Sequence, residues 1–232
     1  KKRGHYSRTI VVVTDGYVTV EEEVFDLIRN NLESANMFAF GIGSSVNRHL
    51  IEGMAHVGMG EPFIIVKPEE AEEKAARFRT MIASPVLTHV KVDFNGFDAY
   101  EVEPVTLPDV LAERPVIVFG KWRGNPYGTI TLSGISGDGN YRETIDVGKV
   151  TPFQSNSALR YLWARHRITI LSDYNKLRVD DRRIKEVTDL GLTYNLLTPY
   201  TSFVAVDTEV RNTGGRPVTI HQPLLMPHCV SD

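Results

Sequence analysis

The feature of this sequence that most constrains its fold is a regular alternation of strand-like and helix-like segments over the first third of the chain. Residues 9–13, 37–42 and 63–66 are short apolar runs of the length of a buried strand. Each run is followed by a stretch that has apolar residues at helical spacing. This β-α-β-α-β-α order predicts a parallel sheet with right-handed crossovers. The β-branched run at residues 9–13 further predicts a strand buried on both faces.

Capping residues and apolar stripes predict the helices of this region. Thr19 and Glu22 have the spacing of a capping box at the start of the first helix. The stripe that would face the sheet consists of Val20, Val24, Leu27, Ile28 and Leu32. Ser44 and Ser45 are expected to cap the second helix, and Pro68 is expected to open the third.

Near residue 84 the pattern changes to strands whose side chains alternate in direction. The first of these strands would place five residues on one face, namely Val86, Thr88, Val90, Val92 and Phe94. Further strands are predicted at residues 115–122, 128–135, 141–147 and 202–206, with a turn at residues 137–140. We expect this region to form an antiparallel sheet or sandwich.

Helical periodicity returns near residues 156–171 and 181–190, and Gly191 is the expected C-cap of the second of these helices. Beyond residue 213, glycine and proline are frequent. Residues 214–232 are therefore expected to be a linker or tail.

Asp15 is the strongest candidate for a functional residue. It directly follows the first apolar run, which places it at the carboxyl end of a parallel strand, where open α/β sheets present ligand sites. The competing interpretation is that Asp15 and Gly16 only form a turn, because Asp-Gly is a common turn dipeptide. Thr14, Gly16 and Ser44 are the further candidates for binding at this edge.

Two groups of segments carry a family resemblance. The run that ends in Thr14-Asp15-Gly16, the junction GIGSSVN at residues 41–47 and the returning run at residues 58–66 resemble the second half of a von Willebrand A (VWA) domain. The segments LWARHRI at residues 162–168 and LTPYTSFVAV at residues 197–206 resemble the region after the VWA domain in inter-alpha-trypsin-inhibitor heavy-chain-like (VIT/VWA) proteins. The resemblance covers about residues 8–207.

This resemblance implies a fold of the α/β plus β-rich class. Residues 1–84 would be the C-terminal half of a VWA parallel sheet with its helices. Residues 85–213 would be an antiparallel β domain with accessory helices, followed by the tail at residues 214–232.

The resemblance also implies a metal site. In this family a divalent cation such as Mg²⁺ is bound by an Asp-x-Ser-x-Ser motif, by a threonine and by an aspartate that ends a later strand. Asp15 matches that last aspartate, and the chain has no Asp-x-Ser-x-Ser motif. We therefore expect the other ligands and the first strands to precede Lys1, and we expect no cation on this chain by itself.

Other catalytic or metal chemistry has little support in the sequence. The seven histidines do not have metal-ligand spacing, and His49 and His56 lie two turns apart on one predicted helix. Ser133 and Ser136 lack the Gly-x-Ser-x-Gly elbow of a hydrolase nucleophile. The glycines between residues 134 and 139 precede a strand, not the helix that a phosphate loop needs.

A nucleic-acid surface is also a weak hypothesis. The formal net charge of −3 creates no global field that favours nucleic acid or an anionic membrane. The basic residues Arg160, Arg165, His166 and Arg167 would fan around a helix, so some of them should point inward and pair with acids. Similarly, the cations at residues 182–185 have acidic neighbours in sequence and are expected to form a self-neutralised surface.

Together these expectations describe a non-enzymatic protein-binding or adhesion module, with a protein or extracellular-matrix ligand as its partner. The alternative is a metal-independent structural scaffold of a cell-envelope or secreted complex. The family resemblance implies a secreted or cell-surface parent. The single cysteine, Cys229, excludes an intrachain disulfide. No apolar run approaches the ~20 residues of a membrane span. An incomplete α/β half would expose apolar sheet edge, so we expect pairing with a second copy or a further segment.

Overall fold

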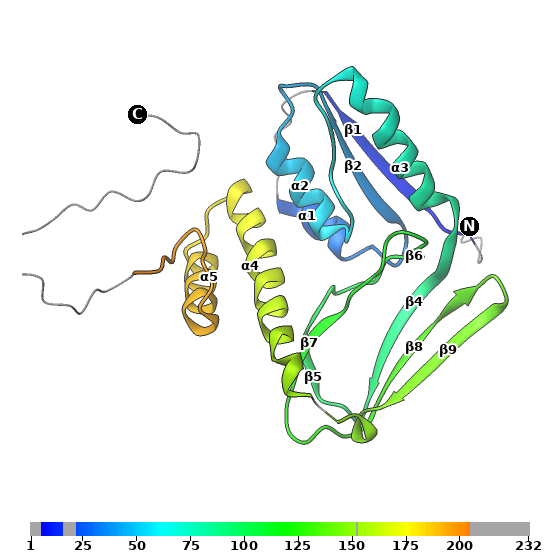
Figure 1. The fold of residues 1–232 in the computed structure, drawn as a ribbon, viewed down its shortest axis with the longest axis vertical. Coiled ribbons are helices and arrows are strands. Elements are labelled where there is room, and N and C mark those ends of the chain that lie inside the picture. The colour runs from blue at the N-terminus through cyan, green and yellow to red at the C-terminus, as the bar shows by residue number, and fades with distance from the viewer. Residues whose placement is uncertain (1–5, 16–21, 152, 205–232) are drawn as a thin grey trace, which may run out of the picture. The chain divides into compact units, whose positions relative to one another are not determined.

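The computed structural model of this chain describes residues 6–15, 22–151 and 153–204. The described residues up to Thr201 belong to one compact unit. This unit begins with an α/β region, continues with antiparallel strands and ends with a pair of helices (Figure 1). No helix in the described part of the chain combines the length and the apolar character needed to cross a membrane.

The α/β region contains a parallel sheet, as the sequence predicts. In the described part of this region, strands β1 (Thr9–Thr14), β2 (Asn36–Ile42) and β3 (Phe63–Ile65) pair in the order β1-β2-β3. The helices that follow these strands are α1 (Glu22–Arg29), α2 (Arg48–Val57) and α3 (Ala71–Ala83), the last preceded by a 3-10 turn (Pro68–Glu70). The predicted strand and helix order is confirmed.

Two apolar clusters cover the two faces of the central strand β2. On one face, Met37 and Ala39 pack with residues of α1 and α2, including Phe25. On the other face, Phe38 and Phe40 pack with β3 and α3, and the rings of Phe40 and Phe63 stack at 4.5 Å. Strand β2 is therefore buried on both faces, as strands of parallel sheets usually are.

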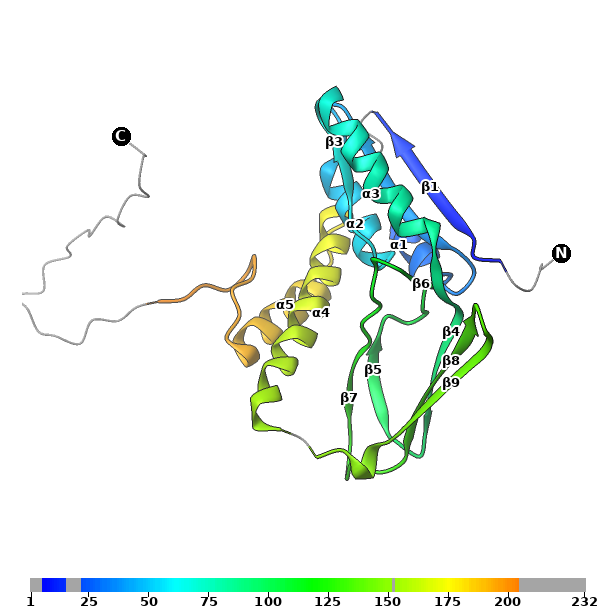
Figure 2. The same cartoon turned by 45° about the vertical axis from the view of Figure 1, so that its right-hand side comes forward.

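Strand β1 is not buried as predicted. Ile10, Val11 and Val13 are 50%, 41% and 58% exposed. Among the described residues β1 pairs only with β2, and it lies at the outer margin of the sheet (Figure 2). Val11 and Val13 are in register with residues 38 and 40 of β2, which α3 covers, but α3 does not extend over β1 itself.

The details of the first two helices also differ from the prediction. Thr19 and Val20 lie outside the described residues, so the capping box is not seen. Leu27 is 66% exposed, and the fully buried residue of α1 is instead Phe25, which the predicted stripe omits. The cap of α2 is Asn47, whose side chain accepts a hydrogen bond from the Leu50 backbone N–H, in place of the predicted Ser44 and Ser45.

The antiparallel part of the fold consists of two sheets. One sheet has the strand order β6-β4-β8-β9 and the other pairs β5 with β7. The strand bounds are β4 (Pro85–Asn95), β5 (Ala99–Glu103), β6 (Val110–Leu111), β7 (Phe119–Trp122), β8 (Thr129–Ser136) and β9 (Gly139–Asp146). The antiparallel class is confirmed, whereas β5 and the two-residue β6 were not predicted and the strand predicted at residues 115–122 begins only at Phe119.

The predicted alternation along β4 fails in its first half. The pairing register with β8 shifts between Thr88 and Lys91, and His89 has a positive φ of 53°. This bulge reverses the direction of the side chains, because one extra residue is inserted into the strand. As a result, Val86 is 53% exposed whereas Thr88 and Val90, which were expected on the same face, are buried, and Leu87 is buried as well.

Two helices follow the sheets, α4 (Leu159–Leu177) and α5 (Asp181–Tyr194), after 3-10 turns at Val147–Lys149 and Gln154–Ala158. Helix α5 ends at Asn195, in the left-handed conformation, and not at the predicted Gly191. Gly191 lies inside the helix, where a Cβ atom would be 2.7 Å from Thr201 Oγ1. The described part of the strand predicted at residues 202–206 is not a strand, and residues 205–206 lie outside the described residues.

Helix α4 packs on the α/β region. Ile170 and Tyr174 of α4 belong to the same apolar cluster as Phe25 of α1 and Met54 of α2. The change from helix to antiparallel strand occurs between Ala83 and β4, at the predicted position. The domain limit at residue 84 stays a prediction, because helices from both sides of it share one core. The limit at residue 213 lies outside the described residues and also stays a prediction.

Candidate functional site

The predicted candidate residues lie at the carboxyl edge of the parallel sheet. Thr14 ends β1, and Asp15 follows it as an exposed bend. The backbone carbonyl of Asp15 accepts a hydrogen bond of 3.2 Å from Ser45 Oγ, and the neighbouring Ser44 is also exposed. The structure therefore brings Asp15 together with the loop that contains Ser44, whereas Gly16 lies outside the described residues.

Glycines shape the loop that meets Asp15. Gly43 has a φ of 96°, a conformation that favours glycine, and its N–H donates to the carbonyl of Ile65 at 2.8 Å. At Gly41, a Cβ atom would lie 2.8 Å from Val46 Cγ2, so glycine allows the start of α2 to approach β2 closely. The contact between Ser45 and Asp15 was not predicted, because the sequence suggested a capping role for Ser45.

The described residues at this edge do not fit a magnesium site. No group of three or more His, Cys, Asp or Glu side chains that could hold a metal ion exists in the described part of the chain. Glu70, the carboxylate bound to the end of β3, accepts a hydrogen bond from the Val66 N–H at 3.1 Å. Mg²⁺ in proteins is usually held by one or two carboxylates together with other oxygen ligands and waters, and Asp15 is the one carboxylate that β1 and the loop at residues 43–47 bring to this edge.

His56 contacts a buried carboxylate and is not part of a metal site among the described residues. His56 of α2 lies 2.6 Å from a carboxylate oxygen of Asp173 in α4, and Lys176 binds the other oxygen at 3.0 Å. Burial acts to raise the pKa of Asp173, but the hydrogen bonds from His56 and Lys176 outweigh it and hold the pKa below its ordinary value. His166, by contrast, has its pKa lowered by burial.

The basic residues of α4 and α5 form ion pairs, as expected. Arg167 donates to Glu186 at 2.8 Å and to the buried Glu103 at 3.3 Å. Arg160 packs over the ring of Tyr161 with 4.8 Å between the guanidinium carbon and the ring centroid. The prediction that part of this cluster points inward and pairs with acids is confirmed for Arg167.

An exposed apolar surface adjoins the carboxyl edge. We call it the β1 surface, and it consists of Ile10, Val11 and Val13 of β1. At the edge itself, Ile42 and Val66 are also 41% and 46% exposed. Val11 and Val13 lie on one face of the strand and Ile10 on the other, because successive side chains of a strand alternate in direction, so both faces of β1 are available to a polypeptide that covers this margin of the sheet.

No protein-family model matches the chain. A von Willebrand factor A domain-containing protein of Dictyostelium discoideum is 25% identical to it over 207 residues, which are 86% of this chain and 25% of that protein. The human von Willebrand factor A domain-containing protein 5B1 is 30% identical over 120 residues, which are 51% of this chain and 10% of that protein.

The chain is related to von Willebrand factor A domain-containing proteins. It spans a quarter or less of the length of these two VWA relatives. Among solved structures, the ArnB paralog VWA2 from Sulfolobus acidocaldarius superposes on 81% of this chain and 56% of its own, with a TM-score of 0.43 and 16% sequence identity.

Proposed function

We propose that this chain is a non-enzymatic protein-interaction module of a VWA-related protein, and that the β1 surface is where it binds. The observation that supports the proposal most strongly is the exposure of Ile10, Val11 and Val13 in a parallel sheet. Parallel sheets usually have both faces covered. Fully burying one valine or isoleucine side chain contributes roughly 1.5–3 kcal/mol, so covering this surface favours association.

Strand β1 also lacks the features that protect an edge strand from pairing. From Thr9 to Thr14 it contains no charged residue and no proline. Natural edge strands are commonly protected by lysine, proline or a bulge. We therefore propose that the partner adds a strand to β1, a recognition mode in which backbone hydrogen bonds supply affinity.

The partner is a protein or extracellular-matrix ligand, or in the parent the further segment expected before Lys1, and in a purified sample the available strand is that of a second copy of the chain. Light scattering should therefore show a mass that rises with concentration from 26.0 kDa toward about twice that value. The substitution Val13→Lys should abolish the rise, because it places a charge in the pairing surface.

The matched control is Leu192→Lys, which changes an equally exposed leucine (67%) on α5, far along the chain from β1. This variant should associate like the unmodified chain. A chain that stays at the monomer mass at all concentrations, or a Val13→Lys variant that associates equally well, would refute the proposed surface.

A second candidate function is a metal-independent scaffold. It is favoured by the lack of a metal-binding group of side chains in the described part of the chain. A ligand that binds only the folded state raises the melting temperature. Millimolar Mg²⁺ should therefore leave the melting temperature of this chain unchanged, and a clear rise would instead support cation-dependent binding.

We further propose that the parent is a secreted or cell-surface protein of the inter-alpha-trypsin-inhibitor heavy-chain-like group. The support is that the two segments carrying this resemblance pack on the same helix, since Trp163 of the first shares an apolar cluster with Leu190 of α5, and Thr198 and Thr201 of the second pack against Gly191 of α5. Cation-dependent binding would then belong to the whole parent. Sequencing upstream of Lys1 tests whether the parent has the cation site, because an Asp-x-Ser-x-Ser motif on an apolar run is expected there.

A further inference from the structure

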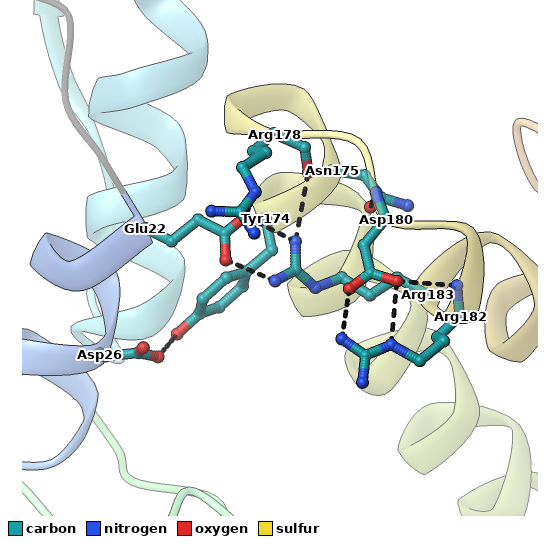
Figure 3. A network of polar contacts seen from close by, with 8 residues as sticks. All are labelled: Glu22, Asp26, Tyr174, Asn175, Arg178, Asp180, Arg182 and Arg183. Carbon is teal, nitrogen blue, oxygen red and sulfur yellow. Dashed lines mark hydrogen bonds and ion pairs between the residues drawn. The ribbon is translucent and has the colours of Figure 1, made fainter.

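Helices α4 and α5 form a hairpin that makes polar contacts with α1 of the α/β region (Figure 3). The contact that joins the residues furthest apart in sequence is made by Arg183 of α5. Its guanidinium donates two hydrogen bonds to the carboxylate of Glu22, at 2.9 and 2.5 Å. Glu22 is the first described residue of α1. The hydrogen bond from Arg183 lowers the pKa of Glu22 below its ordinary value, which shows that the pair favours the ionised carboxylate.

Helix α4 makes the second contact with α1, one turn further on. The hydroxyl of Tyr174 donates to Asp26 at 2.5 Å, and its ring packs edge-on against Phe25 at 5.4 Å. The guanidinium of Arg183 lies over the same Tyr174 ring at 5.2 Å. Arg183 and Tyr174 therefore hold two acids of α1 that lie four residues apart on one face of the helix.

Helix α4 also holds α2. The buried carboxylate of Asp173, with 2% of its side chain exposed, is bound by His56 of α2 at 2.6 Å. Helices α1 and α2 are in turn packed tightly on each other, because a Cβ atom at Gly53 would overlap the Phe25 ring, with Phe25 Cε2 at 2.8 Å. One hairpin thus fixes both helices of this face of the sheet.

These two helices adjoin the carboxyl edge. The residues that lead into α2 include Ser45, whose hydroxyl binds the Asp15 carbonyl. A shift of α2 relative to the sheet would therefore break or remake the contact between Ser45 and Asp15.

We propose that the α4–α5 hairpin is a clamp that positions α1 and α2 and through them holds the carboxyl edge, with Arg183 as its key positioning residue. Two other cations of α5 do not share this role, because Arg182 pairs with Asp180 and Lys185 with Asp189, both at the hairpin itself. Arg178, between the two helices, also pairs with Glu22, but at 3.9 Å, outside hydrogen-bonding distance. The pair can open without unfolding the core, because Arg183 and Glu22 lie outside the apolar cluster of this face and their side chains are still 20% and 16% exposed to water. A partner that engages the hairpin would then alter the edge, and by reciprocity a partner at the edge would alter the hairpin.

Amide hydrogen exchange on the full chain tests the clamp. In Arg183→Ala, exchange should become about tenfold faster in α1 and at residues 43–50, the size expected from losing a hydrogen-bonded charged partner. Exchange in β4 and β8 should not change, which separates local release from global unfolding. Glu22→Gln, a milder change, should give the same pattern with a smaller effect.

The matched control is Arg182→Ala, which removes a neighbouring arginine that also pairs with an acid but does not reach α1. It should leave exchange in α1 and at residues 43–50 unchanged.

The clamp is overturned if Arg183→Ala leaves exchange at residues 43–50 as it was, if Arg182→Ala has the same effect, or if exchange rises equally across the whole unit. Only the consequence for partners rests on the proposed function. The exchange experiment requires no partner. A negative exchange result would therefore not affect the light-scattering result for Val13→Lys, and a negative light-scattering result would not affect the exchange result.

Discussion

At the scale of single residues, Gly53 shows how closely α1 and α2 approach each other. An added Cβ atom would overlap the Phe25 ring, with Cε2 at 2.8 Å and Cζ closer still, and Phe25 is completely buried. Gly53→Ala should therefore lower the free energy of unfolding by about 1–3 kcal/mol through overpacking. Urea denaturation followed by far-UV circular dichroism measures this change.

The control for this prediction is Gly137→Ala, at an exposed turn where nothing lies within 4 Å of the added methyl group. It should leave the free energy of unfolding unchanged. Equal stability of the Gly53→Ala variant and the unmodified chain would show that the two helices do not pack as described.

Asp173 makes the stability of the chain depend on pH. Its pKa in the folded protein lies below the ordinary value, so its ionised form stabilises the fold above the unfolded pKa of about 3.9 and this contribution is lost as the pH falls. Asp173→Asn should therefore be less stable than the unmodified chain at neutral pH. The gap between them in unfolding free energy should shrink from about pH 5 to about pH 3. A gap that stays constant over this range, measured by urea denaturation, would contradict the ion pairs of Asp173.

The position of Asp15 was predictable from sequence, whereas its hydrogen-bond partner was not. An aspartate that follows a short β-branched apolar run is expected at the carboxyl end of a strand, whether or not that strand is buried. The contact with Ser45 depends on the path of the loop between β2 and α2, which Gly43 sets through its positive φ. Similarly, nothing local in the sequence links Arg183 to Glu22, because the two residues lie 161 positions apart.

At the scale of secondary-structure elements, the start of α2 is determined by Asn47. Asn47→Ala should cost about 0.5–2 kcal/mol of unfolding free energy, the usual effect of losing an N-cap side chain. Ser44→Ala, three residues earlier, should cost much less if Asn47 alone caps the helix. Chemical denaturation of the two variants decides between these caps, and the reverse order of stabilities would favour the serine.

Most elements of the α/β region could be predicted because hydrophobic periodicity is local information. Burial could not be predicted in the same way, since it depends on which neighbours a strand has. The run at residues 9–13 reads as a central strand, yet in the described structure β1 lies at the margin of its sheet. The bulge at His89 reverses the alternation of β4 for a similar reason, because it arises from the pairing with β8.

At the scale of the whole molecule, the chain combines a VWA-related α/β region with a helical hairpin that shares its core. The sequence pattern assigned this hairpin to the β-rich domain, because helices and strands that are near in sequence often pack together. The contacts of Ile170 and Tyr174 with α1 and α2 are long-range, so no local pattern could reveal them.

Hydrogen exchange of β1 at two protein concentrations tests the central claim most directly, namely that the β1 surface is the site of protein interaction. Among the described residues β1 pairs only with β2, so the amides of residues 10–13 that point away from β2 would gain hydrogen bonds when a second strand is added. The expected result is slower exchange in Thr9–Thr14 at high concentration and no slowing in the Val13→Lys variant. Exchange in β1 that is the same at both concentrations, while the rest of the chain remains folded, would contradict the claim.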